Sequence, residues 1–269
     1  MKLSQDQLCF ISNLYMQIRP AILASLLKRF LPIGRQYLTA DIGIFYADPL
    51  SQFGNTLLNH GTYEATLLKT VQTKLDPGDT FVDLGANEGF FSVAAAQQVG
   101  ASGTVLAIEP QQRLQPVLQR NFIQNEVAGR IRTLAAAISN TEGEAVLHLS
   151  PDTNTGSSGL ARTTSYRVQT DHVPVLRLID ALDSFRIGVV DLIKIDVEGF
   201  EYEAIMGSQN IFVPDRIRKI ALELHPDLLR KRGHDPESLV GFLEHQGYQR
   251  DPSVCHRLFV PAQEVDTPI

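Results

Sequence analysis

The chain has 269 residues, of which 43% are hydrophobic and 20% are charged. This length and apolar content are enough for one large domain or two small ones with a sizeable buried core, and they argue against intrinsic disorder. With 24 Lys and Arg against 30 Asp and Glu, the net charge of −6 argues against a general nucleic-acid-binding protein. The two cysteines, Cys9 and Cys255, are too few for a disulfide framework and favour a reducing, cytoplasmic location.

The N-terminal segment has a different charge from the rest of the chain. Residues 1–35 contain five basic residues and one acidic residue, a net charge of +4, so the remainder carries −10. Residues 5–31 predict one or two helices with a break at Pro20, and five apolar residues share one helical face: Leu23, Leu26, Leu27, Phe30 and Leu31. No apolar run reaches the length of about 18 residues that a transmembrane helix requires.

We therefore divide the chain into two parts. Residues 1–55 are expected to form an N-terminal helical extension or cap, and residues 56–269 the main domain. The extension is expected to pack on the main domain, where it forms a lid or builds a homodimer through its helices. A helix that lies on a membrane surface is the alternative.

From residue 63 onward, helices alternate with short apolar strands. Helices are expected at residues 63–75, 90–99 and 114–125, and strands at residues 80–84, 105–108 and 131–134. Later in the chain we expect strands at residues 192–195 and 220–224, helices at residues 201–206 and 238–246, and a terminal antiparallel pair at residues 248–250 and 258–260. This alternation predicts an α/β fold with a doubly wound, mostly parallel sheet.

An insertion interrupts the alternation. Residues 145–149 and 166–176 read as strands, and they flank the polar stretch 150–165, which is rich in Gly and Ser. We expect an inserted β-hairpin with a long loop, and loops of this length are often functional.

Residues 81–91 predict a strand, a glycine turn and a helix in direct succession. Gly85 permits a tight turn, and Gly89 allows the helix to pack closely on the strand. In open α/β sheets, ligands bind at such turns at the carboxyl end of a strand. A dinucleotide site would need glycine where this chain has Asn87, and the chain has no nucleoside triphosphate loop. The turn therefore predicts a nucleoside without phosphates, and Asp83 favours one that carries a cationic amine.

Glu109 ends the next strand, 24 residues after Gly85. An acidic residue at this place in a βαβ unit accepts hydrogen bonds from ribose hydroxyls. The pair of features predicts a nucleoside-binding site.

A third motif follows the expected strand at residues 192–195. Asp196, Glu198 and Glu201 come in quick succession before a helix, and Glu223 and His225 end the following strand. One interpretation is that these acidic residues only complement the helix dipole. The alternative is that they meet at the carboxyl ends of adjacent strands, as an acid–base site or a divalent-metal site.

Three motifs resemble those of one family: Asp83-x-Gly-Ala-Asn-x-Gly, Glu109-Pro110 and Lys194-Ile-Asp-Val-Glu-Gly-x-Glu. In order and spacing they are similar to the FkbM-type family of S-adenosylmethionine-dependent methyltransferases, over residues 60–250. The resemblance implies a seven-stranded class I methyltransferase (Rossmann-like) sheet with one antiparallel strand near its edge, S-adenosylmethionine as cofactor, and O-methylation of a sugar or polyketide hydroxyl. The expected cofactor-binding residues are Asp83, Gly85, Ala86, Asn87, Gly89, Phe90, Phe91, Glu109, Pro110, Ala136, Ala137 and Asp196.

An aliphatic hydroxyl is a weak nucleophile at neutral pH and needs a base or a metal ion. We expect Asp196 as the first candidate for the base and His225 as the second, with Glu198 and Glu223 as supporting acids or ligands. One histidine with several carboxylates suits Mg²⁺, Ca²⁺ or Mn²⁺ better than a structural zinc. Base catalysis and metal assistance both stay open.

Two further classes are alternatives to a small-molecule O-methyltransferase. One is a noncatalytic nucleoside-binding or scaffold protein on the same fold, and the other is a Rossmann-type oxidoreductase. Asn87 disfavours the oxidoreductase, because it replaces a glycine that a dinucleotide would need.

Overall fold

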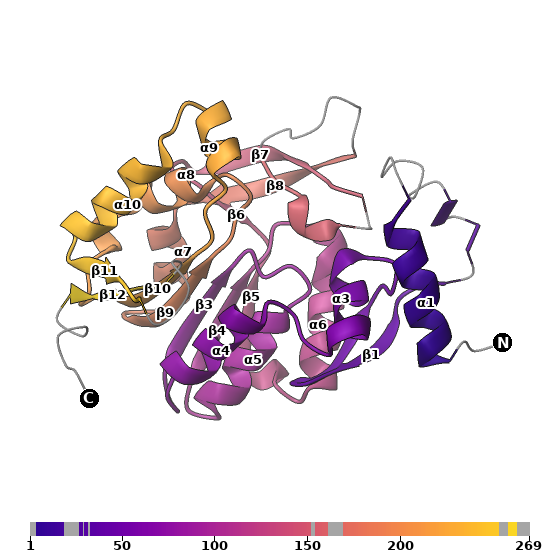
Figure 1. The fold of residues 1–269 in the computed structure, drawn as a ribbon. Helices are drawn as coiled ribbons and strands as arrows, with labels where there is room; N and C mark the ends of the chain where they lie inside the picture. Colours follow the sequence, from indigo (N-terminus) through magenta and orange to yellow (C-terminus); the bar gives the residue numbers. More distant parts are fainter. Residues whose placement is uncertain are drawn as a thin grey trace.

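A seven-stranded sheet forms the centre of the structure, a computed structural model that describes residues 4–18, 27–28, 30–31, 33–151, 154–160, 169–252 and 258–262 (Figure 1). The strand order is β11-β12-β10-β9-β3-β4-β5. The seven strands are β3 (Thr80–Leu84), β4 (Thr104–Ile108), β5 (Ile131–Leu134), β9 (Val190–Ile195), β10 (Ile217–Leu222), β11 (Tyr248–Arg250) and β12 (Leu258–Pro261). The neighbours from β10 to β5 are parallel, whereas β12 runs antiparallel to both β10 and β11. The expected mostly parallel sheet, with one antiparallel strand near its edge, is confirmed.

Helices cover both faces of the sheet. One buried cluster packs α4 (Ala65–Lys74), α5 (Phe90–Val99) and α6 (Gln115–Gln124) against one face. A second cluster packs α7 (Leu178–Ser184), α8 (Glu201–Met206) and α10 (Pro236–His245) against the other. The short helix α9 (Pro226–Lys231) follows β10 directly. The sheet is therefore doubly wound, with its strands buried on both faces.

Alternation along the central strands decides which side chain meets which helix layer. In β3, Phe81 belongs to the cluster under α4 and α5, whereas Val82 and Leu84 belong to the other cluster. Asp83 shares the face of Phe81, and the parallel register places it beside Lys194 of β9. A buried charged pair thus occupies positions where the pattern alone would call for apolar residues.

The insertion forms a separate three-stranded sheet of order β6-β8-β7. Its strands are β6 (Ala137–Ile138), β7 (Gly143–His148) and β8 (Thr170–Leu176), of which β7 and β8 are antiparallel. The expected hairpin is present. Of the loop between its strands, residues 152–153 and 161–168 lie outside the described residues.

The N-terminal segment contains helices and also a β-hairpin. Helix α1 (Gln5–Met16) is followed by the antiparallel strands β1 (Gln36–Ala40) and β2 (Gly43–Ala47) and by helix α3 (Gln52–His60). The inward side chains of this hairpin, Leu38 and Phe45, join the core cluster of α4 and α5. The predicted domain boundary at residue 55 falls inside α3, and the core continues across it.

Part of the expected apolar N-terminal face lies outside the described residues, namely Leu23 and Leu26, as does Cys255. Leu27 and Phe30 are exposed, and so are Phe10 and Leu14 of α1. No helix in the described part of the chain has both the length and the apolar content to span a bilayer.

Strand β10 ends earlier than expected. It stops at Leu222 instead of residue 224, because Pro226 starts α9. The last backbone hydrogen bond to β9 runs from the Glu223 amide to the Ile195 carbonyl (2.9 Å). Glu223 and His225 therefore lie beyond the strand that they were expected to end, and His225 is the residue that precedes α9. The helices α3, α7 and α9 were also not expected from the sequence.

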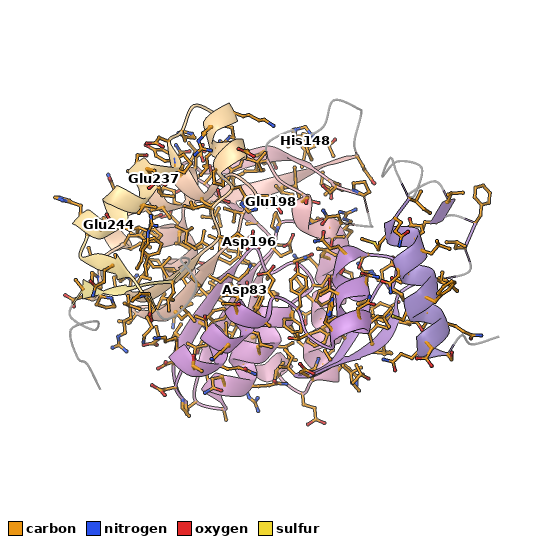
Figure 2. The ribbon with its side chains drawn as sticks, viewed as in Figure 1. Asp83, His148, Asp196, Glu198, Glu237 and Glu244 are labelled. Atoms are coloured by element: carbon orange, nitrogen blue, oxygen red, sulfur yellow. The ribbon has the colours of Figure 1, made fainter. Side chains whose placement is uncertain are left out.

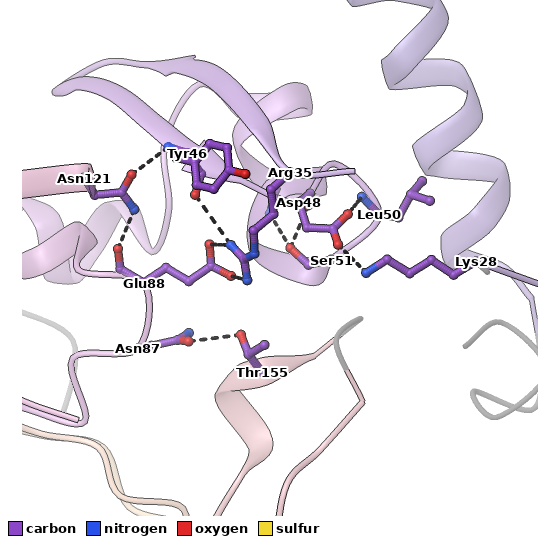
Figure 3. Close-up of polar contacts among 11 residues, drawn as sticks. Lys28, Arg35, Tyr46, Asp48, Leu50, Ser51, Asn87, Glu88, Asn121 and Thr155 are labelled. Carbon is purple, nitrogen blue, oxygen red and sulfur yellow. Dashed lines mark hydrogen bonds and ion pairs between the residues drawn. The ribbon is translucent and has the colours of Figure 1, made fainter. Parts of the chain in front are cut away.

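Arg35 attaches the N-terminal segment to the glycine turn (Figure 3). Its guanidinium donates to both carboxylate oxygens of Glu88, at 2.7 and 3.0 Å, and Glu88 is buried. Burial raises the pKa of the Glu88 carboxyl, and the hydrogen bonds from Arg35 oppose this only in part. Asn121 of α6 completes the junction: it donates to the Glu88 carbonyl and accepts from the Tyr46 amide.

We expect Arg35→Ala to lower the free energy of unfolding by about 3 kcal/mol, because it leaves a buried carboxyl without its partner. Arg177→Ala, which removes an exposed ion pair with Asp180, is the matched control and should have a much smaller effect. Urea denaturation followed by circular dichroism measures both. Equal losses in the two variants would contradict a structural role for the Arg35–Glu88 pair.

Candidate active site

A cleft opens at the carboxyl ends of β3, β4, β9 and β10. The expected site residues that line it are Gly85, Ala86, Asn87, Phe90, Phe91, Glu109, Pro110, Ala136, Ala137, Asp196, Glu198, Glu223 and His225. Two expected residues, Asp83 and Gly89, do not line the cleft and lie beneath it. Figure 2 shows Asp83, Asp196 and Glu198 near the centre of the molecule, away from Glu237 and Glu244 on α10.

The glycine turn needs its glycines for close packing. Gly85 has a φ of 86°, and a Cβ atom there would lie 1.9 Å from the carbonyl oxygen of Asp196. At Gly89, a Cβ would lie 2.7 Å from the ring of Phe122. Gly89 therefore allows contact with α6, and not with the strand as expected. Asn87 also adopts a left-handed φ of 49°, which asparagine tolerates better than most residues.

Glu109 joins the turn to the loop after β4. The buried carboxylate accepts hydrogen bonds from the amides of Asn87 (2.8 Å) and Gln111 (2.9 Å). Burial raises its pKa, and these two bonds oppose the rise. Each oxygen has a second lone pair, so the carboxylate can accept a further hydrogen bond from a ligand in the cleft.

Lys194 lies beneath the turn, and the sequence analysis gave it no role. Its ammonium donates to the Gly85 carbonyl (2.9 Å) and lies 3.4 Å from Asp83 and 3.5 Å from Asp196. Burial would lower the pKa of Lys194, but the charges of Asp83 and Asp196 outweigh it and raise the pKa. Asp83 also accepts from the Ser92 hydroxyl of α5 (2.6 Å). These contacts let Asp83 order the turn from below.

Asp196, Glu198 and His225 form a cluster on the cleft wall. His225 Nε2 lies 3.5 Å from Glu198 and 4.0 Å from Asp196. On the other side of the ring, Nδ1 lies 2.9 Å from an oxygen of the buried Glu201. Because an ionised carboxylate only accepts hydrogen bonds, Nδ1 is the donor and Nε2 faces the other two acids.

The electrostatics of the cluster reflect its crowded negative charge. Burial, together with Asp196, Glu201 and Glu223, raises the pKa of Glu198 to about 7 against the opposing effect of His225. Burial alone would lower the pKa of His225, but the hydrogen bond with Glu201 and the nearby carboxylates raise it to about 9. The cluster therefore favours positive charge at its centre.

Two other segments complete the cleft. Tyr63, just before α4, lines the cleft. Burial raises the pKa of the Tyr63 hydroxyl, and the negative charge of Glu64 adds a smaller rise. Asn154 and residues 156–160 of the insertion also line the cleft, and the buried Thr155 between them donates to the Asn87 side chain (3.0 Å; Figure 3). Lys194 was visible in the sequence as a lysine within an apolar strand. Tyr63 and Thr155 carry no such local signal.

The strand order, the antiparallel β12 and the glycine turn after β3 together define the class I methyltransferase fold. The family model described as "Methyltransferase FkbM domain" matches residues 83–250, more than half of the chain. The chain belongs to this family of methyltransferases. The matched range includes Asp83, Glu109, Asp196, Glu198 and His225.

Solved structures with similar folds have low sequence identity to this chain. A S-adenosylmethionine-dependent O-methyltransferase from Thermotoga maritima has 12% identity and a TM-score of 0.42, covering 80% of this chain and 72% of that one. Methyltransferase FkbM from Methylobacillus flagellatus has 19% identity and a TM-score of 0.47, covering 78% and 54%. A precorrin-6y C5,15-methyltransferase from Geobacter metallireducens has 17% identity and a TM-score of 0.41, covering 69% and 71%. A search of curated proteins found no match.

We expect Lys194→Met to lower the free energy of unfolding by about 3–5 kcal/mol, because it leaves the buried Asp83 without a cation. The double variant Lys194→Met with Asp83→Asn should recover part of this loss, since it removes the unpaired charge. Urea denaturation of both single variants and the double variant measures the coupling. Strictly additive losses would contradict the pairing.

Proposed function

We propose that the protein transfers a methyl group from S-adenosylmethionine to a hydroxyl oxygen of a small molecule of the sugar or polyketide type. The observation that carries the proposal is the contact between the glycine turn and the acidic cluster. Gly85 has no room for a Cβ beside the Asp196 carbonyl, so the cofactor turn and the residues that act on the acceptor share one wall of the cleft.

The turn suits a nucleoside without phosphates. Asn87 and its neighbours lack the glycine spacing that lets a backbone approach a pyrophosphate. Glu109 retains lone pairs for ribose hydroxyls, and Ala136 and Ala137 supply small apolar side chains for an adenine ring. The net negative charge supports a small-molecule acceptor in preference to a nucleic acid.

When bound, the cofactor supplies an electrophilic methyl group: a carbon–oxygen bond forms as the carbon–sulfur bond breaks, and the electron pair stays on sulfur. The residues of the chain orient the acceptor and promote loss of its hydroxyl proton. Asp196, Glu198 and His225 are our candidates for this role because they line the cleft together. Closeness of donor and acceptor contributes much of the rate in such reactions.

Glu109→Ala should weaken binding of S-adenosylhomocysteine by ten- to a hundredfold, because charge-assisted hydrogen bonds contribute about 1.5–3 kcal/mol each. Isothermal titration calorimetry measures the affinity, and circular dichroism confirms the fold. Glu244→Ala, an exposed acid on α10, is the control and should bind like the wild type. Unchanged affinity in Glu109→Ala would refute the ribose assignment. Binding of NAD in place of S-adenosylhomocysteine would favour an oxidoreductase.

Asp196→Asn should retain S-adenosylhomocysteine binding and lose at least about a hundredfold in turnover, because the variant lacks a carboxylate that either accepts the hydroxyl proton or binds an ion that activates the hydroxyl. The assay supplies methyl-labelled S-adenosylmethionine to a panel of monosaccharides and hydroxylated polyketides, and NMR locates the label. Glu244→Gln is the matched control. Label on nitrogen or carbon, or full activity of Asp196→Asn, would contradict the proposal. Cofactor binding with no transfer to any acceptor would favour the noncatalytic alternative.

A further inference from the structure

Three potential metal ligands converge on one point of the cleft wall. Asp196 follows β9, Glu198 lies in the turn before α8, and His225 precedes α9. One ligand atom from each lies within 4.8 Å of the other two. At a metal–ligand distance of about 2.1 Å, adjacent ligands of an octahedral ion lie about 3.0 Å apart and opposite ones about 4.2 Å apart. The separations of 3.5 and 4.0 Å around His225 Nε2 fall in that range.

Glu201 holds the histidine ring in the orientation that a metal ligand needs. One of its oxygens accepts from His225 Nδ1 and from the Gly199 amide, each at 2.9 Å. Its other oxygen is buried and has no hydrogen-bond partner among the described residues. Metal-binding histidines usually donate their second ring nitrogen to a carboxylate in this manner, which leaves the other nitrogen directed at the ion.

The charges around this point are not balanced by the neighbouring lysine. Lys194 is shared between Asp83 and Asp196, so it does not neutralise Glu198 or Glu201. Carboxylates that lie this close together repel one another unless a cation lies between them. A divalent cation at Nε2 of His225 would take the place of the Nε2 proton and neutralise these carboxylates.

We propose that Asp196, Glu198 and His225 bind a divalent cation of the Mg²⁺ or Mn²⁺ class. Two carboxylate oxygens and one imidazole suit these ions and leave open positions in an octahedral shell. The assignment of a role rests on the proposed function: the ion binds the acceptor hydroxyl, lowers its pKa and holds the oxygen toward the methyl donor. The hydroxyl proton passes to water in the cleft. In this arrangement Asp196 serves as a ligand instead of as the base.

The test is binding of Mn²⁺ alone, measured by electron paramagnetic resonance without cofactor or acceptor. The full chain should bind one Mn²⁺, and Mg²⁺ should displace it. His225→Ala and Glu198→Gln should each weaken binding at least tenfold, whereas His245→Ala and Glu244→Gln, matched exposed residues on α10, should not. A Kd weaker than about 1 mM, or equal binding in all four variants, would overturn the proposal.

This readout separates the metal site from the proposed function. Mn²⁺ binding that depends on His225 supports the site even if S-adenosylhomocysteine does not bind. Conversely, S-adenosylhomocysteine binding without Mn²⁺ binding refutes the site and leaves the methyltransferase proposal intact. In the methyl-transfer assay, EDTA should abolish turnover and Mg²⁺ or Mn²⁺ should restore it. Full turnover in EDTA would overturn the role assigned to the ion.

Discussion

The buried ammonium of Lys194 is the interaction on which the site depends. It joins the carboxyl ends of β3 and β9 by contacting Asp83, the Gly85 carbonyl and Asp196. A charge buried this deeply is stable only while its partners surround it. The glycine turn therefore keeps its place relative to Asp196, and through Asp196 relative to the cluster around His225. One lysine positions both halves of the cleft.

Two segments outside the main sheet contact adjacent residues of that turn. Arg35 from the N-terminal segment binds Glu88, and Thr155 from the insertion binds Asn87. The backbone of Asn87 also donates to Glu109. The turn is thus fixed from the N-terminal segment, the insertion and the neighbouring strand. The N-terminal segment is consequently part of the structure of the site, although the family match begins only at residue 83.

Much of the central fold was predictable because its signals are local. The strand at residues 80–84, the helix at 90–99 and the glycine turn between them follow from apolar runs and glycine spacing. Contacts between distant residues leave no such pattern, so the pairing of Lys194 with Asp83 and the place of Tyr63 in the cleft could not be predicted. The end of β10 was misjudged because Leu224 continues the apolar pattern, whereas Pro226 commits the chain to α9.

The adjacency of β3 and β9 also determines how ligand binding is linked to folding. Lys194 and the Gly85 carbonyl that it binds are 109 residues apart in the sequence, so their contact closes a long loop. Closing this loop costs conformational entropy, which the pairing of β3 with β9 offsets. A partly folded chain without this pairing has no complete cleft. A ligand of the cleft therefore binds only the fully paired sheet, and it stabilises the whole domain by RT ln(1 + [L]/Kd). Saturating the cleft thus opposes global unfolding, and not merely the opening of the nearest loop.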